Sequence, residues 1–301
     1  MKTGVYIRKI TVEGLWNVSD LVWELTPEVN ILAGNNGSGK STILRCLSDM
    51  FTQGSISPSH RGRLRRLVVE FTDDTTVSSE EPFDPSSYRI SVVNTFDTTL
   101  QESEAIYKLS DGTVATYLDW ELYKLQNRYL AYQLEVGKAV IAAFFFVRAS
   151  SEIYTGTERK SLFFDTLDAL LKPTGKRVDR DSDMLQFETP YGMTIRPHQL
   201  SSGEKQALII LTNVLIQSGR EYIMVMDEPE ISLHFDWQRR LIEDIRRLNP
   251  KLQLIVATHS PAVVMNGWTD RVTEIGDLIR PRSEDDGPKK KDGPENPIRT
   301  K

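Results

Sequence analysis

The sequence predicts an α/β fold with a mixed sheet at its centre. A short apolar segment, residues 29–33, leads into a glycine-rich turn and then into an amphipathic helix expected over residues 39–50. Farther along, helices and strands alternate: a helix at 204–217, a strand at 222–226, a helix at 235–248 and a strand at 252–258. Such alternation implies parallel strands that are joined by crossover helices.

The other segments are predicted from periodicity and turn residues. We expect strands at 6–12, 21–25, 63–71 and 88–95, a helix at 115–134, a buried strand at 139–147, a helix at 158–171 and a hairpin at 185–195. Residues 281–301 mix lysines with acids, prolines and glycines, a composition that is typical of a disordered tail.

Composition and charge favour a cytoplasmic protein without a membrane partner. Hydrophobic residues make up 39% of the chain and charged residues 26%, an ordinary balance for a globular protein. No apolar run approaches the roughly 18 residues of a membrane helix. The single cysteine, Cys46, cannot form an internal disulfide, which fits a reducing compartment. The net charge of −5 does not itself indicate nucleic acid, although it leaves room for a local basic patch.

Residues 34–41 predict a site for a nucleotide and Mg²⁺. They read Gly-Asn-Asn-Gly-Ser-Gly-Lys-Ser and match G-x-x-x-x-G-K-[ST], the phosphate-binding loop or P-loop. Its glycines let backbone N–H groups point at phosphate oxygens, and the following helix adds its positive end. Lys40 would neutralise the β- and γ-phosphates, and the Ser41 hydroxyl would ligate Mg²⁺. The expected nucleotide contacts are Asn35, Asn36, Gly37, Ser38, Gly39, Lys40, Ser41 and Thr42.

Three later motifs supply further polar groups. Residues 200–204, Leu-Ser-Ser-Gly-Glu, precede a helix, so Ser201 and the backbone of Gly203 can approach a phosphate. The strand at 222–226 ends in Asp227 and Glu228, which suit a Mg²⁺ ligand and a general base. The strand at 252–258 ends beside His259. Each motif alone has an ordinary structural explanation, so the functional interpretation depends on the order of the motifs along the chain.

Together the four motifs resemble those of ABC-type ATPases, collinearly and over roughly residues 5–279. The resemblance implies the ABC-ATPase P-loop NTPase fold, ATP hydrolysis and a homodimer whose two sites are shared head-to-tail. It implies catalytic roles for Lys40, Glu228 and His259, a metal site at Ser41 and Asp227, and Ser201 and Gly203 binding nucleotide across the interface. One bilobed domain is then expected over 1–280, with a P-loop lobe at about 1–150 plus 204–280 and a helical signature lobe at about 151–203.

The branch of the family is indicated by residues 227–234, Asp-Glu-Pro-Glu-Ile-Ser-Leu-His. This run resembles the OLD-like (overcoming lysogenization defect) ATPases, which are close to the SMC and DNA-repair ATPases. The segment between the P-loop and residue 200 is too short for a long coiled coil, and the one after His259 is too short for a Toprim nuclease domain. The resemblance therefore implies a stand-alone head that controls a separate effector, a nuclease or toxin, in bacterial anti-phage defence.

Two other functions remain open from the sequence. A DNA-binding ATPase of the SMC or repair type would use the basic cluster at Arg61, Arg63, Arg65 and Arg66, although a solvated strand explains that cluster as well. A transporter subunit is disfavoured, because transporters usually have aspartate where His234 stands. The Q-loop of the family is expected at residues 94–97 or at Gln101. The alternating aspartates at 179–183 lack a calcium-loop pattern and predict a solvated loop.

Overall fold

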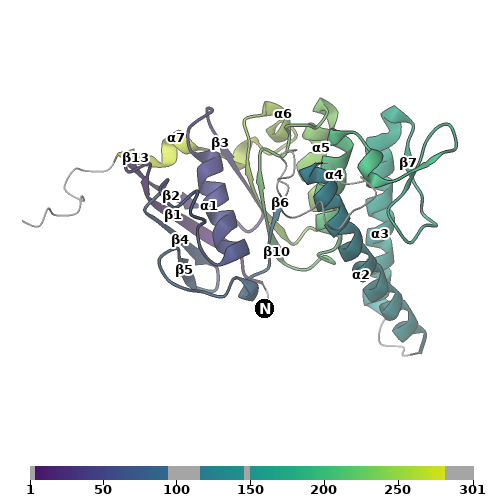
Figure 1. Ribbon diagram of the computed structural model, residues 1–301. Helices are drawn as coiled ribbons and strands as arrows, with labels where there is room; N and C mark the ends of the chain where they lie inside the picture. The colour runs from purple at the N-terminus through teal and green to yellow at the C-terminus, as the bar shows by residue number, and fades with distance from the viewer. Residues whose placement is uncertain (1–3, 94–115, 146–149, 282–301) are drawn as a thin grey trace, which may run out of the picture.

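The computed structural model describes residues 4–93, 116–145 and 150–281 of the 301-residue chain (Figure 1). Its centre is a five-stranded parallel sheet in the order β12-β3-β11-β10-β6. The strands are β3 (Val29–Ala33), β6 (Ile90–Val93), β10 (Tyr222–Asp227), β11 (Leu252–Ala257) and β12 (Val272–Glu274). β10 and β11 are buried along almost their whole length, as expected of parallel strands covered on both faces.

Helices cover the two faces of this sheet. Ile223 and Val225 of β10 belong to the apolar cluster that contains α1 (Lys40–Gln53), whereas Met224 and Met226 belong to the cluster of α4 (Ser202–Leu215) and α5 (Phe235–Leu248). Alternate residues of one strand thus face two separate cores. The crossover helix α5 joins the parallel strands β10 and β11, as the sequence predicts.

A second sheet is antiparallel and packs on the other side of α1. Its order is β13-β2-β1-β4-β5, and the cluster around α1 includes buried residues of both sheets. The strands are β1 (Ile7–Leu15), β2 (Ser19–Glu24), β4 (Arg66–Phe71), β5 (Thr76–Ser78) and β13 (Ile279–Pro281). The combination of parallel and antiparallel sheets with helices confirms the predicted α/β fold.

The helical part consists of α2 (Tyr117–Phe145) and α3 (Ser150–Leu171), which run side by side away from the sheets in Figure 1. α2 packs on α4 through a buried ion pair, in which Lys205 Nζ lies 2.8 Å from Asp119 Oδ1. A small antiparallel sheet follows, with β7 (Arg177–Val178), β8 (Phe187–Glu188) and β9 (Thr194–Ile195). The β8–β9 pair confirms the predicted hairpin. The division into two lobes at residues 151 and 203 stays a prediction.

Short helices complete the chain: η1 (Pro85–Ser87), η2 (Lys172–Thr174), η3 (Pro197–Gln199), α6 (Pro261–Val264), η4 (Thr269–Arg271) and α7 (Ile275–Leu278). Neither α2 nor any other helix in the described ranges combines the length and the apolar character needed to span a bilayer.

One predicted element is wrong. Residues 139–145, expected as the greater part of a buried strand, continue helix α2, and Ile141 is 62% exposed. A short apolar run does not by itself distinguish a strand from a helix, and here the helix that begins at Tyr117 carries through it. Residues 146 and 147 lie outside the described ranges, as does the expected tail beyond Pro281, which ends β13.

Candidate nucleotide site

The P-loop connects β3 to α1 through glycines that a side chain could not replace. Gly34, Gly37 and Gly39 have φ angles of 144°, 79° and 105°, in the region that favours glycine. A Cβ atom on Gly34 would lie only 2.6 Å from Ile275 Cγ2. Gly39 is the N-cap of α1 and forms no side-chain capping bond, so no cap side chain covers the N–H groups of the first helical turn. The loop therefore has the backbone of a phosphate cradle.

A cavity of about 250 Å³ lies over this loop. Segments that are far apart in the sequence line it: Trp16, Asn36, Gly37, Ser38, Gly39, Lys40, Ser41, Thr42, Glu228 and His259. The carboxyl ends of β3, β10 and β11 meet here, which is where ligands bind in parallel α/β sheets. The structure thus gathers the P-loop, the end of the β10 motif and the histidine after β11 into one site.

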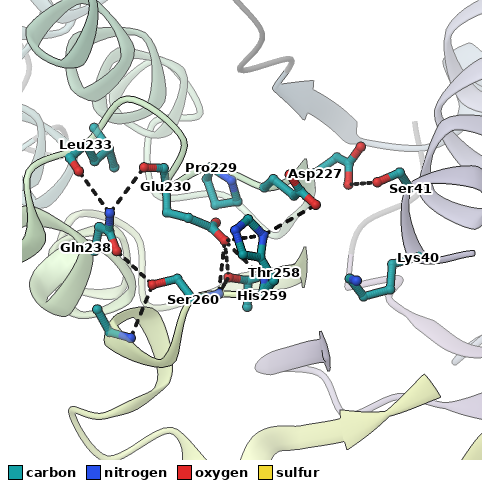
Figure 2. Close-up of polar contacts among 12 residues, drawn as sticks. Lys40, Ser41, Asp227, Pro229, Glu230, Leu233, Gln238, Thr258, His259 and Ser260 are labelled. Carbon is teal, nitrogen blue, oxygen red and sulfur yellow. Dashed lines mark hydrogen bonds and ion pairs between the residues drawn. The ribbon is translucent and has the colours of Figure 1, made fainter. Parts of the chain in front are cut away.

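Lys40 is only 3% exposed and lies within the loop that precedes it. Its Nζ donates to the carbonyl oxygen of Gly34 at 2.7 Å and to that of Asn35 at 3.0 Å. These two hydrogen bonds hold the ammonium group at the wall of the cavity. Figure 2 shows Lys40 across the site from His259.

Ser41 and Asp227 provide oxygen atoms next to each other. The Ser41 hydroxyl donates to Asp227 Oδ1 at 2.8 Å, and Arg45 Nε lies 3.5 Å from Asp227 Oδ2 (Figure 2 shows the Ser41 contact). Burial raises the pKa of Asp227. The contacts with Ser41 and Arg45 lower this pKa and the neighbouring Glu228 raises it, and the net result is an increase. A hydroxyl beside a buried carboxylate that lacks solvation fits a hard divalent cation such as Mg²⁺.

Glu228 and His259 approach each other at the ends of β10 and β11. Glu228 has a φ angle of 48°, and its backbone N–H donates to Ala257 O at 2.8 Å, which fixes the sharp turn after the strand. Non-glycine residues with positive φ are uncommon and cluster at functional sites. His259 Nδ1 lies 3.5 Å from Glu228 Oε1. A carboxylate and an imidazole are therefore close together on the wall of the cavity.

The segment at 200–204 forms the start of α4 but does not line this cavity. Ser201 is the N-cap, and its backbone N–H donates to Glu204 Oε2 at 2.9 Å in a reciprocal capping box. Burial opposes ionisation of Glu204, but hydrogen bonds from Lys176 and Ser201 leave its pKa lowered. A Cβ atom on Gly203 would lie 2.4 Å from Ser232 O, so glycine lets α4 approach the loop after β10. Ser201 itself is exposed.

Trp16 lines the cavity, and the sequence analysis did not identify it as a site residue. It lies in the turn between β1 and β2, is 42% exposed, and would be 3.2 Å from a Cβ atom on Gly39. The signal that could have found it is an aromatic residue in the turn between the two strands that precede the P-loop strand in the sequence.

The remaining candidates lie elsewhere. Residues 94–97 and Gln101 are outside the described ranges. Arg65 Nη2 lies 2.6 Å from Glu13 Oε2, and Arg66 pairs with Glu13 and Glu80, so two of the four arginines of the basic cluster form ion pairs at the start of β4. In the described ranges no three histidine, cysteine or acidic side chains are placed to hold a metal ion. His60 pairs with Asp49 at 2.7 Å.

A protein-family model described as "AAA domain, putative AbiEii toxin, Type IV TA system" matches residues 60–266. The chain belongs to this family. The matched segment contains Asp227, Glu228 and His259, whereas the P-loop precedes it. Membership in this ATPase family, together with the P-loop, identifies the chain as an ATP-binding enzyme that hydrolyses ATP.

Comparison with individual proteins agrees with this assignment. The Septu protein PtuA of Bacillus thuringiensis is 23% identical over 325 aligned positions, which cover 90% of this chain and 76% of that protein. The Retron Vc95 probable ATPase of Vibrio cholerae serotype O1 biovar El Tor is 30% identical over 98 residues, but these are 29% of this chain and only 19% of that ATPase.

The fold of this family member is that of an SMC head. The solved structure of an Smc head bound to the C-winged helix domain of ScpA superposes with a TM-score of 0.54 and 15% identity, covering 93% of this chain and 98% of that one. This confirms the predicted ABC-type P-loop ATPase fold.

Proposed function

We propose that this ATPase is a conformational switch in which two copies close head-to-tail around two ATP molecules. The observation that carries the proposal is the division of the motifs. The P-loop, Glu228 and His259 line one cavity, whereas Ser201 and Gly203 lie outside it on the capped start of α4. A helix N-terminus with an exposed serine favours phosphate binding, and a second copy can present it to the cavity.

Each side chain of the site has a proposed role. The backbone of residues 35–42 and the Lys40 ammonium bind the phosphates. Ser41 and Asp227 would hold Mg²⁺, which neutralises charge on the phosphate oxygens when it is bound. Glu228 orients and deprotonates the attacking water, and His259 Nε2 accepts a hydrogen bond from the second proton of that water. Ser201 and Gly203 of the second copy cap the same phosphate.

Removal of Lys40 or Asp227 tests the site assignment. Lys40→Ala removes the buried ammonium group that would bind the phosphates, and Asp227→Ala removes the carboxylate next to Ser41. Each variant is expected to lower kcat/KM for ATP by about 10²-fold or more. Phosphate release by the purified variants measures this. The matched control is Lys251→Ala, which removes a lysine whose side chain is 61% exposed and should leave the rate unchanged. Wild-type turnover in either site variant contradicts the assignment.

Trp16 is proposed as the platform on which the adenine stacks. Trp16→Ala should raise the Kd for ATP by roughly 5- to 150-fold, because stacking of a base on an aromatic ring contributes about 1–3 kcal/mol. Inorganic tripolyphosphate has no base, so its affinity should not change. Val18→Ala, in the same turn but outside the lining of the cavity, is the control. Equal weakening of ATP and tripolyphosphate binding would show that Trp16 supports the loop rather than the base.

We further propose that the switch acts on a separate effector in bacterial anti-phage defence. Support comes from the family description, which names a toxin–antitoxin system, and from the Septu and retron relatives. ATP closure biases a partner through contacts that differ between the open and closed dimers. For the alternative, direct action on DNA, Arg65 and Arg66 of the basic cluster would have to give up their ion pairs with Glu13 and Glu80.

A further inference from the structure

Glu230 is a carboxylate buried beside the site rather than in its cavity. The residue is 3% exposed, lies two positions after Glu228, and does not line the cavity over the P-loop. A buried carboxylate is costly unless hydrogen bonds or an opposite charge compensate it. Its position therefore calls for a physical explanation.

Hydrogen bonds fix the Glu230 side chain against the segment that follows β11. Its Oε1 accepts from the Thr258 hydroxyl and from the backbone N–H groups of His259 at 3.2 Å and Ser260 at 3.3 Å (Figure 2). The backbone around it is held as well. Gln238 Nε2 donates to Glu230 O at 3.3 Å, while Gln238 Oε1 accepts from the Ser260 hydroxyl at 2.7 Å. These contacts join the loop after β10, the start of α5 and the segment 258–260.

The same carboxylate faces the imidazole of His259. His259 Nδ1 lies 3.6 Å from Glu230 Oε1 and 3.5 Å from Glu228 Oε1. The two carboxylates differ in their surroundings, because the Glu230 side chain is 4% exposed and held by three donors, whereas that of Glu228 is 19% exposed and lines the cavity. Glu228 can thus move with the reacting water while Glu230 stays in place.

The charges around Glu230 also indicate that it acts together with His259. Glu230 Oε2 is buried and accepts no hydrogen bond within the part of the chain that the structure describes. Among those residues, His259 is the one group able to carry positive charge that forms an ion pair with Glu230. A proton on Nδ1 would place a positive or partly positive N–H beside this carboxylate, which compensates its burial.

We propose that Glu230 is a positioning residue for His259. It fixes the backbone of His259 and holds the proton on Nδ1, so that the imidazole keeps one orientation at the cavity wall and Nε2 stays unprotonated to accept a hydrogen bond from the attacking water. The carboxylate acts through the histidine and does not touch ATP, in the same way that a buried acid orients the histidine of a catalytic triad. The inference rests on the proposed role of His259 in hydrolysis.

The tautomer of His259 tests this directly. The chain contains four histidines, so ¹⁵N-histidine labelling gives a simple spectrum in which His259 is assigned by its loss in His259→Gln. Without nucleotide, we expect a protonated Nδ1 in the wild type. In Glu230→Gln, which keeps the shape but loses the charge, we expect a bare Nδ1 and a proton on Nε2. Glu228→Gln should retain the proton on Nδ1.

Kinetics supply a second readout on the same variants. Glu230→Gln should lower kcat by about 10- to 100-fold, the loss found when a carboxylate that orients a metal-binding histidine is removed, with the Kd for ATP unchanged. Asp244→Asn is the matched control, because it also neutralises a carboxylate that is 3% exposed, on α5 and away from His259. It should change neither the tautomer of His259 nor kcat.

Two results would overturn the inference. A bare Nδ1 in the wild type does so without any variant, even if Glu230→Gln fails to fold. An unchanged tautomer and kcat in folded Glu230→Gln do so as well. Failure of the proposed function is separate, since it would appear as a wild-type protein without ATPase activity, whereas the tautomer is measured without ATP.

Discussion

Glu228→Gln is expected to bind ATP and to hydrolyse it about 10²- to 10⁴-fold more slowly than the wild type, the range lost with a general base. The amide keeps the shape of the side chain at the end of β10 but is not basic. Because hydrolysis is what reopens the closed form, the variant should accumulate as an ATP-bound dimer. Light scattering after size exclusion with Mg·ATP measures the dimer, and single-turnover phosphate release measures the chemical step.

Glu221→Gln is the control for this experiment, since Glu221 lies just before the opposite end of β10 and outside the cavity. It should behave as the wild type in both assays. A Glu228→Gln protein that stays monomeric at saturating Mg·ATP, under conditions where the wild type dimerises, contradicts the role of Glu228. The trapped dimer is also the form with which to search for the effector, because a partner of the switch should co-purify in different amounts with the trapped and nucleotide-free proteins.

The P-loop and the strands around it could be predicted from the sequence because their signals are local. Residues 34–41 require glycine at positions of positive φ, and β3 appears at Val29–Ala33 as expected. The ends of β10 and β11 were placed from apolar runs that stop at Asp227 and beside His259. Parallel pairing then brings those ends to one edge of the sheet, so the meeting of Glu228 with His259 follows from topology.

Long-range contacts could not be read from the sequence in the same way. Glu230 appears only as part of a resemblance, and its approach to His259 depends on the turn at Glu228 and on three donors from another segment. Trp16 reaches the cavity because β1 and β2 place their turn beside Gly39. The continuation of α2 through residues 139–145 was missed for a local reason, since a short apolar run fits a strand and a helix equally well.

The central claim is that one copy completes the site of another, and a mixture of two inactive variants tests it. Lys40→Ala disables the P-loop, and Ser201→Arg replaces the exposed N-cap of α4 with a bulky cation. Ser201→Arg should still bind ATP, because Ser201 is not part of the cavity of its own chain. Ser201→Arg should instead lose ATP hydrolysis. Loss of the N-cap itself should lower the free energy of unfolding by only about 1 kcal/mol.

Steady-state ATPase activity of the mixture is the deciding measurement. In a two-fold symmetric dimer, each heterodimer contains one site with an intact P-loop and an intact Ser201, so an equal mixture should recover roughly a quarter of wild-type activity per chain. Each variant alone should stay inactive at the same total concentration, and subunit exchange is followed with labelled chains. Recovery at that level is the result predicted by a shared site. No recovery at any ratio, despite exchange, would show that the P-loop and Ser201 act within one chain.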